Sequence, residues 1–268
     1  MKSLRQLSAG FAVAGFIGVA FAADPAAPMS AADLASRLSA QRENGSTDVR
    51  LRMEIQQPVG TKKATFQIQI KERRTPAEAD VAYVVLWPRE RKAESLLVRQ
   101  KAGAAPEAWH FPAGGKSPEE TAMSESVFGS DLAVADVIEN FFSWKDQALV
   151  GTEVVDRVAC QILESKPGSG DFSIYGHVLS WVDPRRMVPL RIEKYLPSGK
   201  LARRIETTRV VPQGSHGNLP ANLTVRASGK DSLTELDGSR IRYDVTFTDR
   251  EFTPAGLREL AAPKPEAK

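Results

Sequence analysis

The sequence predicts a mainly β (α+β) fold, a large curved antiparallel sheet or half-open β-barrel of about eleven strands closed by short helices. Runs of alternating apolar and polar residues recur at short intervals between turn residues, and strands do not alternate regularly with helices as in a parallel sheet. Only three stretches have helical spacing. A single sheet of this size curls, so its concave face must be filled by helices or by a ligand.

The N-terminus has the features of a secretory signal peptide over residues 1–22. Lys2 and Arg5 give a basic start, residues 9–20 are apolar but short for a membrane span, and Ala20-Phe21-Ala22 is a cleavage signal. We therefore expect a soluble exported protein. An uncleaved anchor helix is the alternative.

The remainder is expected to form one domain over residues 30–260, because all-β domains often reach this length undivided. Residues 23–29, rich in Ala and Pro, are predicted to be a mobile spacer, and residues 261–268 a disordered tail.

Charge and cysteine content exclude some classes of partner and bond. The formal net charge is +3, which argues against nucleic acid as a partner. Cys160 is the single cysteine, so an intramolecular disulfide is impossible, and its apolar neighbours predict a small buried side chain. A monomer is expected.

The first elements are a helix and a β-hairpin. Ser30–Arg42 is predicted to be a short amphipathic helix with Ser30 as its N-cap. Val49–Ile55 and Phe66–Ile70 alternate in polarity and are joined by a Pro-Val-Gly link, so they form an antiparallel pair with one apolar face. Val81–Trp87 is apolar on both faces, which predicts that a helix covers its outer face.

A meander of three strands follows later in the chain: Ser173–Asp183, Met187–Leu196 and Leu201–Val211. Leu190, Ile192 and Leu196 are spaced by even steps, which predicts one apolar face. The Pro-Ser-Gly-Lys link before Leu201 is a hairpin turn, because Pro presets φ and Gly accepts a positive φ. The other predicted strands are Glu94–Lys101, Ala108–Phe111, Gln147–Gly151, Val154–Lys166, Asn222–Ser228 and Arg240–Thr248, and Thr253–Leu260 is a predicted short helix.

Ser126–Trp144 breaks the alternating pattern and is predicted to be a helical insertion, with Asp131 as its cap. Its apolar residues are candidates for a lid or plug over the sheet, with ordinary helix-to-sheet packing as the alternative. These candidates are Leu132, Ile138, Phe141, Phe142 and Trp144.

The sequence contains no recognisable catalytic or metal-binding motif. Its three histidines, His110, His177 and His216, are not at metal-ligand spacing, and no nucleophile elbow, phosphate loop or dinucleotide fingerprint occurs. We predict a protein that is not an enzyme and needs neither metal nor cofactor. A hydrolase with a Ser or Thr beside His110 or His177 is the alternative.

Apolar surface on the concave face is the remaining feature. If the helices leave a cavity, the first strands line it through Leu51, Met53, Ile55, Phe66, Ile68, Ile70, Tyr83 and Trp87. Burying an acyl chain of roughly fourteen carbons would contribute on the order of 11 kcal/mol, at ~0.8 kcal/mol per methylene. A lipid carrier therefore needs only a closable apolar concavity. The alternative is that these residues are simply core.

The run Phe128–Val137 (FGSDLAVADV) resembles the G-S-D-F-S-Y-E-D-L signature of the periplasmic outer-membrane lipoprotein-sorting family, which has the LolA/LolB-like fold. The resemblance continues through five further segments: Cys160–Leu163, Tyr175–Asp183, Pro189–Tyr195, Ser198–Leu201 and Phe247–Leu260. It points to Asp131, Asp136, Trp181 and Asp183 as motif residues. Leu132 and Val134 replace the aromatic residues of the signature, and Ala135 replaces its acidic one.

This resemblance implies a half-open barrel that is closed by helices and holds acyl chains, and association with an inner-membrane exporter of the resistance-nodulation-division (RND) type. We therefore expect a periplasmic carrier of lipid or lipoprotein that shields acyl chains during envelope transport. An accessory interaction module of a lipid exporter, without a ligand of its own, is the alternative.

Overall fold

The computed structural model describes residues 29–43, 45–75 and 77–261. The predicted signal peptide, all of the predicted spacer except Met29 and all of the predicted tail except Ala261 lie outside these residues. Within them, thirteen strands form one antiparallel sheet in the order β6-β5-β4-β3-β2-β1-β13-β12-β11-β10-β9-β8-β7. None of the described helices is long and apolar enough to span a membrane.

The helices are α1 (Ala31–Glu43), α2 (Val134–Ile138) and α3 (Pro254–Ala261), with 3-10 helices η1 (Arg89–Arg91), η2 (Phe141–Ser143), η3 (Gly214–His216) and η4 (Asp249–Phe252). The first strands are β1 (Gly45–Gln56), β2 (Ala64–Arg74), β3 (Glu78–Trp87), β4 (Ser95–Lys101), β5 (Glu107–Phe111) and β6 (Glu119–Glu120). The later strands are β7 (Asp146–Val155), β8 (Val158–Lys166), β9 (His177–Asp183), β10 (Val188–Tyr195), β11 (Leu201–Pro212), β12 (Asn218–Ala227) and β13 (Leu233–Tyr243).

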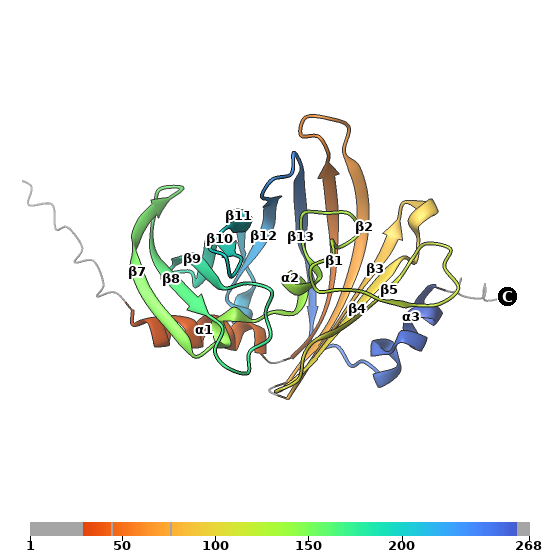
Figure 1. Cartoon of the computed structure of the whole chain (residues 1–268), viewed down its shortest axis with the longest axis horizontal. Helices are drawn as coiled ribbons and strands as arrows, with labels where there is room; N and C mark the ends of the chain where they lie inside the picture. Colours follow the sequence, from red (N-terminus) through yellow and green to blue (C-terminus); the bar gives the residue numbers. More distant parts are fainter. Residues whose placement is uncertain (1–28, 44, 76, 262–268) are drawn as a thin grey trace, which may run out of the picture.

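The sheet is strongly curved and stays open, as Figure 1 shows. One half consists of β1 to β6 and the other of β7 to β12, and β13 joins them by pairing with both β1 and β12. The end strands β6 and β7 do not pair with each other. The predicted fold class, a large curved antiparallel sheet with few short helices, is confirmed.

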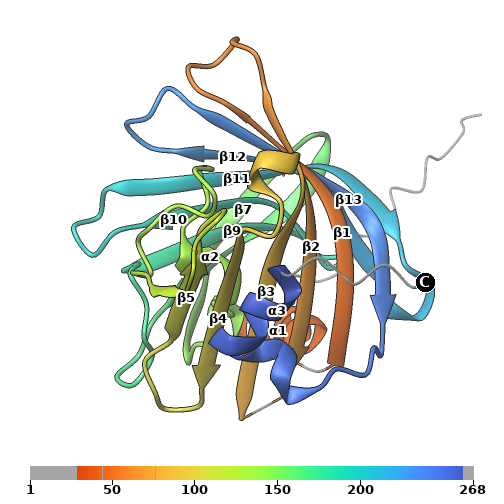
Figure 2. The same cartoon turned by 90° about the vertical axis from the view of Figure 1, so that its right-hand side faces the viewer.

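Alternation puts opposite sets of β3 and β4 side chains on the two faces of the sheet. Val81 and Val85 belong to a buried cluster on the concave face, whereas Ala82 and Leu97 pack with Leu257 of α3. Figures 1 and 2 show α3 lying outside the sheet over β3 and β4. The predicted helical cover of this strand's outer face is confirmed.

The first helix forms where the sequence predicts it. The Ser30 hydroxyl accepts a hydrogen bond from the Asp33 amide at 3.1 Å, so Ser30 caps the helix. Leu34 and Leu38 are buried against Leu163 and Val178 of β8 and β9. The helix thus covers the inner face of the second half of the sheet.

Two turns show why some strand boundaries were predicted correctly and others were not. Gly199 has φ +79° in the turn between β10 and β11, as its sequence predicts. The turn between β7 and β8 lies at Asp156 and Arg157, which both have positive φ, and not between Gly151 and Val154, where one predicted strand ends and the next begins. Neither of the two turn residues is Gly or Asn, so the sequence lacks the usual signal for this hairpin.

The last predicted strand, Arg240–Thr248, is wrong at both ends. Strand β13 begins at Leu233 and ends at Tyr243, because Asp244 adopts φ +54° and breaks the extended backbone. Phe247 therefore leaves the sheet and packs edge-on against Phe252, with ring centroids 5.4 Å apart.

The meander also departs from its predicted single apolar face. The pairing of β10 with β9 shifts register between Pro189 and Arg191. A bulge of this kind reverses the side-chain phase. Leu190 consequently packs with Trp181, whereas Ile192 packs on the opposite side beside the cluster under α1.

Candidate functional site

The concave face of β1 to β5 is covered by residues 122–145, which we call the insertion. Only Val134–Ile138 of the insertion is α-helical, so the predicted helical segment is mostly irregular backbone with a 3-10 turn. Figure 1 shows α2 inside the curve of the sheet. We call the concave face of β1 to β5 the wall. The buried apolar residues of the insertion that pack against the wall are Val127, Phe128, Leu132, Val134, Val137 and Ile138.

Seven of the eight predicted lining residues lie in this wall. Met53, Ile55, Phe66, Ile68 and Ile70 are buried in the cluster with the insertion, and Leu51 and Tyr83 pack at its margin. Trp87 does not join them and is 49% exposed. The pairing of β2 with β3 shifts register between Gln67 and Ile68, so Trp87 loses the phase of Val85.

The five candidate lid residues divide between two clusters. Leu132 and Ile138 pack on the wall formed by β1 to β5. Phe141, Phe142 and Trp144 pack under α1 on β8 and β9, with the Phe141 and Phe142 ring centroids 4.4 Å apart. The insertion therefore spans both halves of the sheet.

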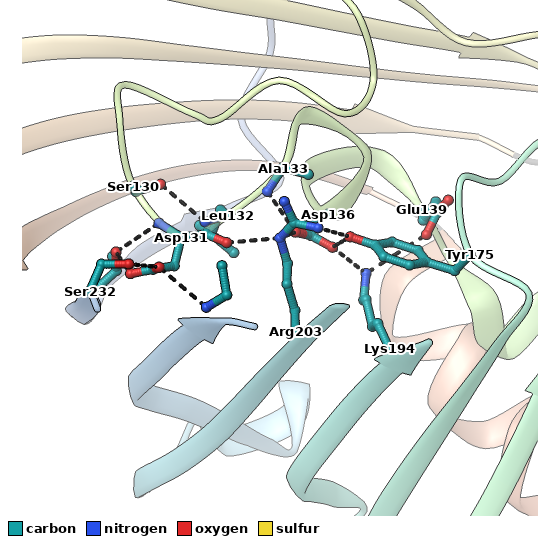
Figure 3. A network of polar contacts seen from close by, with 12 residues as sticks. Ser130, Asp131, Leu132, Ala133, Asp136, Glu139, Tyr175, Lys194, Arg203 and Ser232 are labelled. Carbon is teal, nitrogen blue, oxygen red and sulfur yellow. Dashed lines mark hydrogen bonds and ion pairs between the residues drawn. The ribbon is translucent and has the colours of Figure 1, made fainter. Parts of the chain in front are cut away.

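A buried carboxylate, that of Asp131, ties the insertion to the middle of the sheet (Figure 3). The Thr234 hydroxyl donates to Asp131 Oδ2 at 2.8 Å, and the Ala227 amide and Ser232 hydroxyl donate to Oδ1. The predicted role of Asp131 as a helix cap is wrong, because Ala133 occupies the N-cap position and Asp131 bonds to β12, β13 and the turn between them.

Asp136 is the centre of a second group of contacts, drawn in Figure 3. The Lys194 ammonium of β10 and the Tyr175 hydroxyl each lie 2.7 Å from its Oδ1, and the Arg203 guanidinium of β11 lies 3.2 Å from Oδ2. The Ala133 amide also donates to Oδ2 at 2.7 Å, which starts α2. Four separate segments thus meet on one buried carboxylate.

Asp136 and the neighbouring Glu139 have pKa values that are shifted in opposite directions. Burial alone would raise the pKa of Asp136, but the charges of Lys194 and Arg203 outweigh it and hold that pKa below its usual value. Burial raises the pKa of Glu139, whose Oε2 lies 3.7 Å from the Lys194 ammonium. Asp136 therefore keeps its charge, while Glu139 is the group that gains a proton on acidification.

Fewer polar contacts hold the insertion to the other half of the sheet. Arg74 of β2 donates to the carbonyl oxygens of Ile138 and Val137 at 3.1 and 3.4 Å. The guanidinium of Arg91 is 3.5 Å from the Phe128 carbonyl oxygen. The remaining described contacts with this half are mainly apolar.

The other two motif residues lie away from the insertion. Trp181 donates its indole N–H to Glu153 at 2.6 Å and lies under the Arg191 guanidinium, 5.1 Å from the ring centroid. Asp183 accepts the Arg185 amide at 2.9 Å and pairs with Arg186 in the turn before β10. Both residues therefore support the β9–β10 hairpin.

The three histidines are dispersed. His177 and His216 stack on Tyr195 and Tyr243 with ring centroids 4.4 and 3.8 Å apart. His110 lies 3.0 Å from Glu94. Each histidine thus has a local partner on or beside the sheet.

Two cavities occur in the described residues, of which only the second borders the insertion, and neither is lined by the predicted lining residues. A polar one of about 160 Å³ lies among β1, β12 and β13. A mixed one of about 320 Å³ lies between the end of α1, the ends of β2 to β4 and the β8–β9 loop. Ile138 and Trp144 are the candidate lid residues that reach the second.

Sequence reasoning missed Lys194, Arg203, Tyr175 and Ser232. One signal was available, because Lys194 follows Ile192 by two positions and so puts a cation on an inward face. Its carboxylate partner is 58 residues away in the chain, which no local pattern reports.

Comparison with known proteins identifies the family. A family model described as uncharacterized-protein-like matches residues 78–259, which is more than half of the chain. The chain belongs to this family. No curated protein matches its sequence significantly.

Solved structures share the fold. A DUF1329 family protein from Desulfovibrio piger is 22% identical with a TM-score of 0.76, and covers 85% of this chain and 97% of its own. A domain assigned to outer membrane lipoprotein sorting, from Vibrio parahaemolyticus, is 17% identical with a TM-score of 0.74, at 85% and 98% coverage. A LolA superfamily protein from Nitrosomonas europaea is 18% identical with a TM-score of 0.67, at 84% and 98% coverage. The LolA-like fold predicted from the motif is confirmed.

Proposed function

We propose that this protein is a periplasmic carrier that shields the acyl chains of a lipid or lipoprotein between the insertion and the wall formed by β1 to β5. The asymmetry of the insertion's attachments carries this proposal. On the side of β10 to β13 it is held by charged and buried hydrogen bonds, and on the side of β1 to β5 chiefly by apolar packing.

An acyl chain can replace apolar packing without leaving polar groups unsatisfied. Its entry therefore costs the least free energy where the polar contacts are fewest. Arg74 and Arg91 are the polar attachments on that side. Opening would separate the wall from Leu132 and Ile138 while Asp131 and Asp136 keep the insertion anchored. The apolar packing that is displaced offsets part of the gain from burying the ligand.

The envelope location rests on the signal-peptide features of residues 1–22 and on the resemblance to lipoprotein-sorting proteins. A carrier of this kind needs a donor, and an RND-type exporter of the inner membrane is the partner that the resemblance suggests. The β1–β5 wall then acts as the receiving surface, with no catalytic step.

Acyl uptake by wild type and Leu132→Ala tests this proposal. Leu132 is 9% exposed in the wall cluster, so shortening it weakens the plug that competes with the ligand. We expect bound lipid in the purified protein by mass spectrometry, and tighter binding of a fluorescent fatty acid by Leu132→Ala. Val154→Ala, at a 67% exposed position of β7, is the matched control and should bind as wild type does.

One observation favours the second candidate, an interaction module of an exporter without its own ligand. Met53 and Ile68 are fully buried under the insertion, so the wall is already filled by the chain itself. This function requires that neither wild type nor Leu132→Ala takes up lipid, and that the protein still captures an inner-membrane transporter after delipidation. That pair of results would replace the carrier proposal.

A further inference from the structure

The cavity of about 320 Å³ combines cationic and apolar side chains at the end of the sheet. It lies where the C-terminal end of α1, the ends of β2 and β4 and the start of β3 come together, beside the C-terminal end of α2 (Figure 1). Arg42, Arg74 and Lys101 are its cationic lining residues, and Glu78, Glu139 and Asp171 its acidic ones. A volume of this size is at the lower end of the range for small-molecule sites, roughly 300–1,000 Å³.

Several of these charges are already compensated. Arg74 pairs with Glu72 and donates to the two carbonyl oxygens at the end of α2. Glu78 lies 3.4 Å from the Arg99 guanidinium, and Glu139 lies near Lys194. Asp171 accepts the Gly168 amide at 2.8 Å.

Arg42 differs from Arg74 in this respect. Within the described parts of the chain, no hydrogen bond or ion pair engages its guanidinium. Burial and the nearby charge of Arg74 lower the pKa of Arg42, and the charges of Glu72 and Glu139 offset only part of this effect, so its surroundings disfavour the cation that it carries. A guanidinium in a cavity with free donors is complementary to an anionic oxygen group.

The rest of the lining is suited to a hydrocarbon. Ile138 and Trp144 are buried beside the cavity, and Phe172 is 41% exposed in the β8–β9 loop. Ile138 also belongs to the wall cluster, so this cavity borders the surface proposed above to receive acyl chains. Charge and apolar surface therefore meet at one edge of the insertion.

We propose that this cavity binds the anionic head of the ligand, a carboxylate or a phosphate, with Arg42 as its principal donor. The inference deepens the proposed function, on which its acyl part rests, by selecting acidic amphiphiles over neutral ones. Arg74 keeps its contacts with Glu72 and with the carbonyl oxygens of the insertion. Lys101 is an exposed residue of the lining, and its charge attracts an anion from solvent.

The test compares a fluorescent fatty acid, the fatty alcohol of the same chain length, and inorganic phosphate as ligands of the full protein. Wild type should bind the acid about tenfold or more tightly than the alcohol, the ratio expected of one charge-assisted hydrogen bond. Arg42→Gln should lose that ratio by weakening the acid alone. Arg37→Gln, an exposed arginine of the same helix, should retain it.

The outcomes separate this inference from the carrier proposal. Equal binding of acid and alcohol in wild type would overturn the anion site and leave the carrier standing. Phosphate binding that depends on Arg42 without uptake of either amphiphile would support the anion site and overturn the carrier. Absence of binding by all three ligands would overturn both. Circular dichroism of Arg42→Gln establishes that a lost ratio comes from a folded protein.

Discussion

At the residue scale, the position of the insertion depends on a buried ion pair. Asp136 and Lys194 are each 2% exposed in their side chains, and their closest atoms are 2.7 Å apart. Such pairs contribute little net stability when both members are present, yet removing one member leaves the other uncompensated in a medium of low polarity. The cluster is therefore a determinant of where the insertion sits.

Asp136→Asn should lower the free energy of unfolding by about 3–5 kcal/mol, the usual cost of breaking a buried ion pair. Lys194 and Arg203 would lose their shared anion, and Ala133 would lose the acceptor that starts α2. Urea denaturation followed by tryptophan fluorescence measures the change. Asp146→Asn, at an exposed position of β7, should shift the midpoint very little, and an equal effect of the two variants would contradict this role.

Glu139→Gln should stabilise the protein at neutral pH. Because burial raises the pKa of Glu139 in the folded state, the native protein bears the cost of a buried charge above that pKa. The cost disappears as the pH falls from the raised folded value to the ordinary value of 4.5. The difference in Tm between variant and wild type should therefore be positive at pH 7 and shrink toward pH 4.5. A constant difference across this window would show that Glu139 does not titrate in this way, and Glu119→Gln on β6 serves as the exposed control.

At the element scale, the pairing between β1 and β13 joins the first half of the sheet to the rest, and it contains a tight backbone contact. The register shifts between Arg50 and Arg52, and Gly238 lies against Leu51 at that point. A Cβ on Gly238 would lie 2.8 Å from the Cβ of Leu51. Only glycine fits there without moving a strand.

Gly238→Ala should accordingly cost about 1–3 kcal/mol, the range for overpacking a tight contact. Gly151→Ala on β7 is a matched control, because its Cβ would meet only Ile162 Cδ1 at 3.6 Å, an ordinary contact. The control should be neutral or slightly stabilising in the same urea titration. Equal stability of the two variants would mean that β1 and β13 can separate without cost.

The elements that the sequence predicts well are those in which local pattern and tertiary packing agree. Residues 49–55 and 66–70 alternate and pair as expected, and Gly199 forms the predicted turn. Prediction failed where a single residue altered the phase of a strand, as at the bulge that turns Trp87 outward, or where a turn used Asp156 in place of glycine. Such shifts depend on contacts across strands, which alternation along one strand does not contain.

Periodicity predicts the apolar half of the candidate site, and the motif names Asp131 and Asp136 in the polar half without their partners. Periodicity assigns Met53, Phe66 and Ile68 to one face, and the structure buries them together. The polar half joins Asp131 to Thr234, which is 103 residues away, and Asp136 to Lys194. Spacing along the chain gives no information on partners at such separations.

At the scale of the whole molecule, the second half of the sheet buries a cysteine that reports on its integrity. Cys160 packs with Val188 and Leu190 and is 1% exposed. Burial also raises the pKa of its thiol, which lowers the fraction of reactive thiolate.

Native protein should therefore react with a thiol reagent far more slowly than urea-unfolded protein. Asp136→Asn should accelerate the reaction in proportion to its loss of stability if opening is global. An acceleration by Asp136→Asn without a change in urea midpoint would instead indicate local opening of β7 to β10. The absorbance of released thiolate gives the rate.

The position of β13 has a consequence for how the protein is made. Its partner β1 pairs Val49 with Ile241, so the seam in the middle of the sheet forms between nearly opposite ends of the described chain. While the chain emerges from a ribosome or a membrane pore, β1 and β12 each present an unpaired edge until residues 233–243 appear. Exposed edges of this kind join readily to other chains. Correct assembly consequently waits for the last strand, and a newly made molecule needs protection from its neighbours until then.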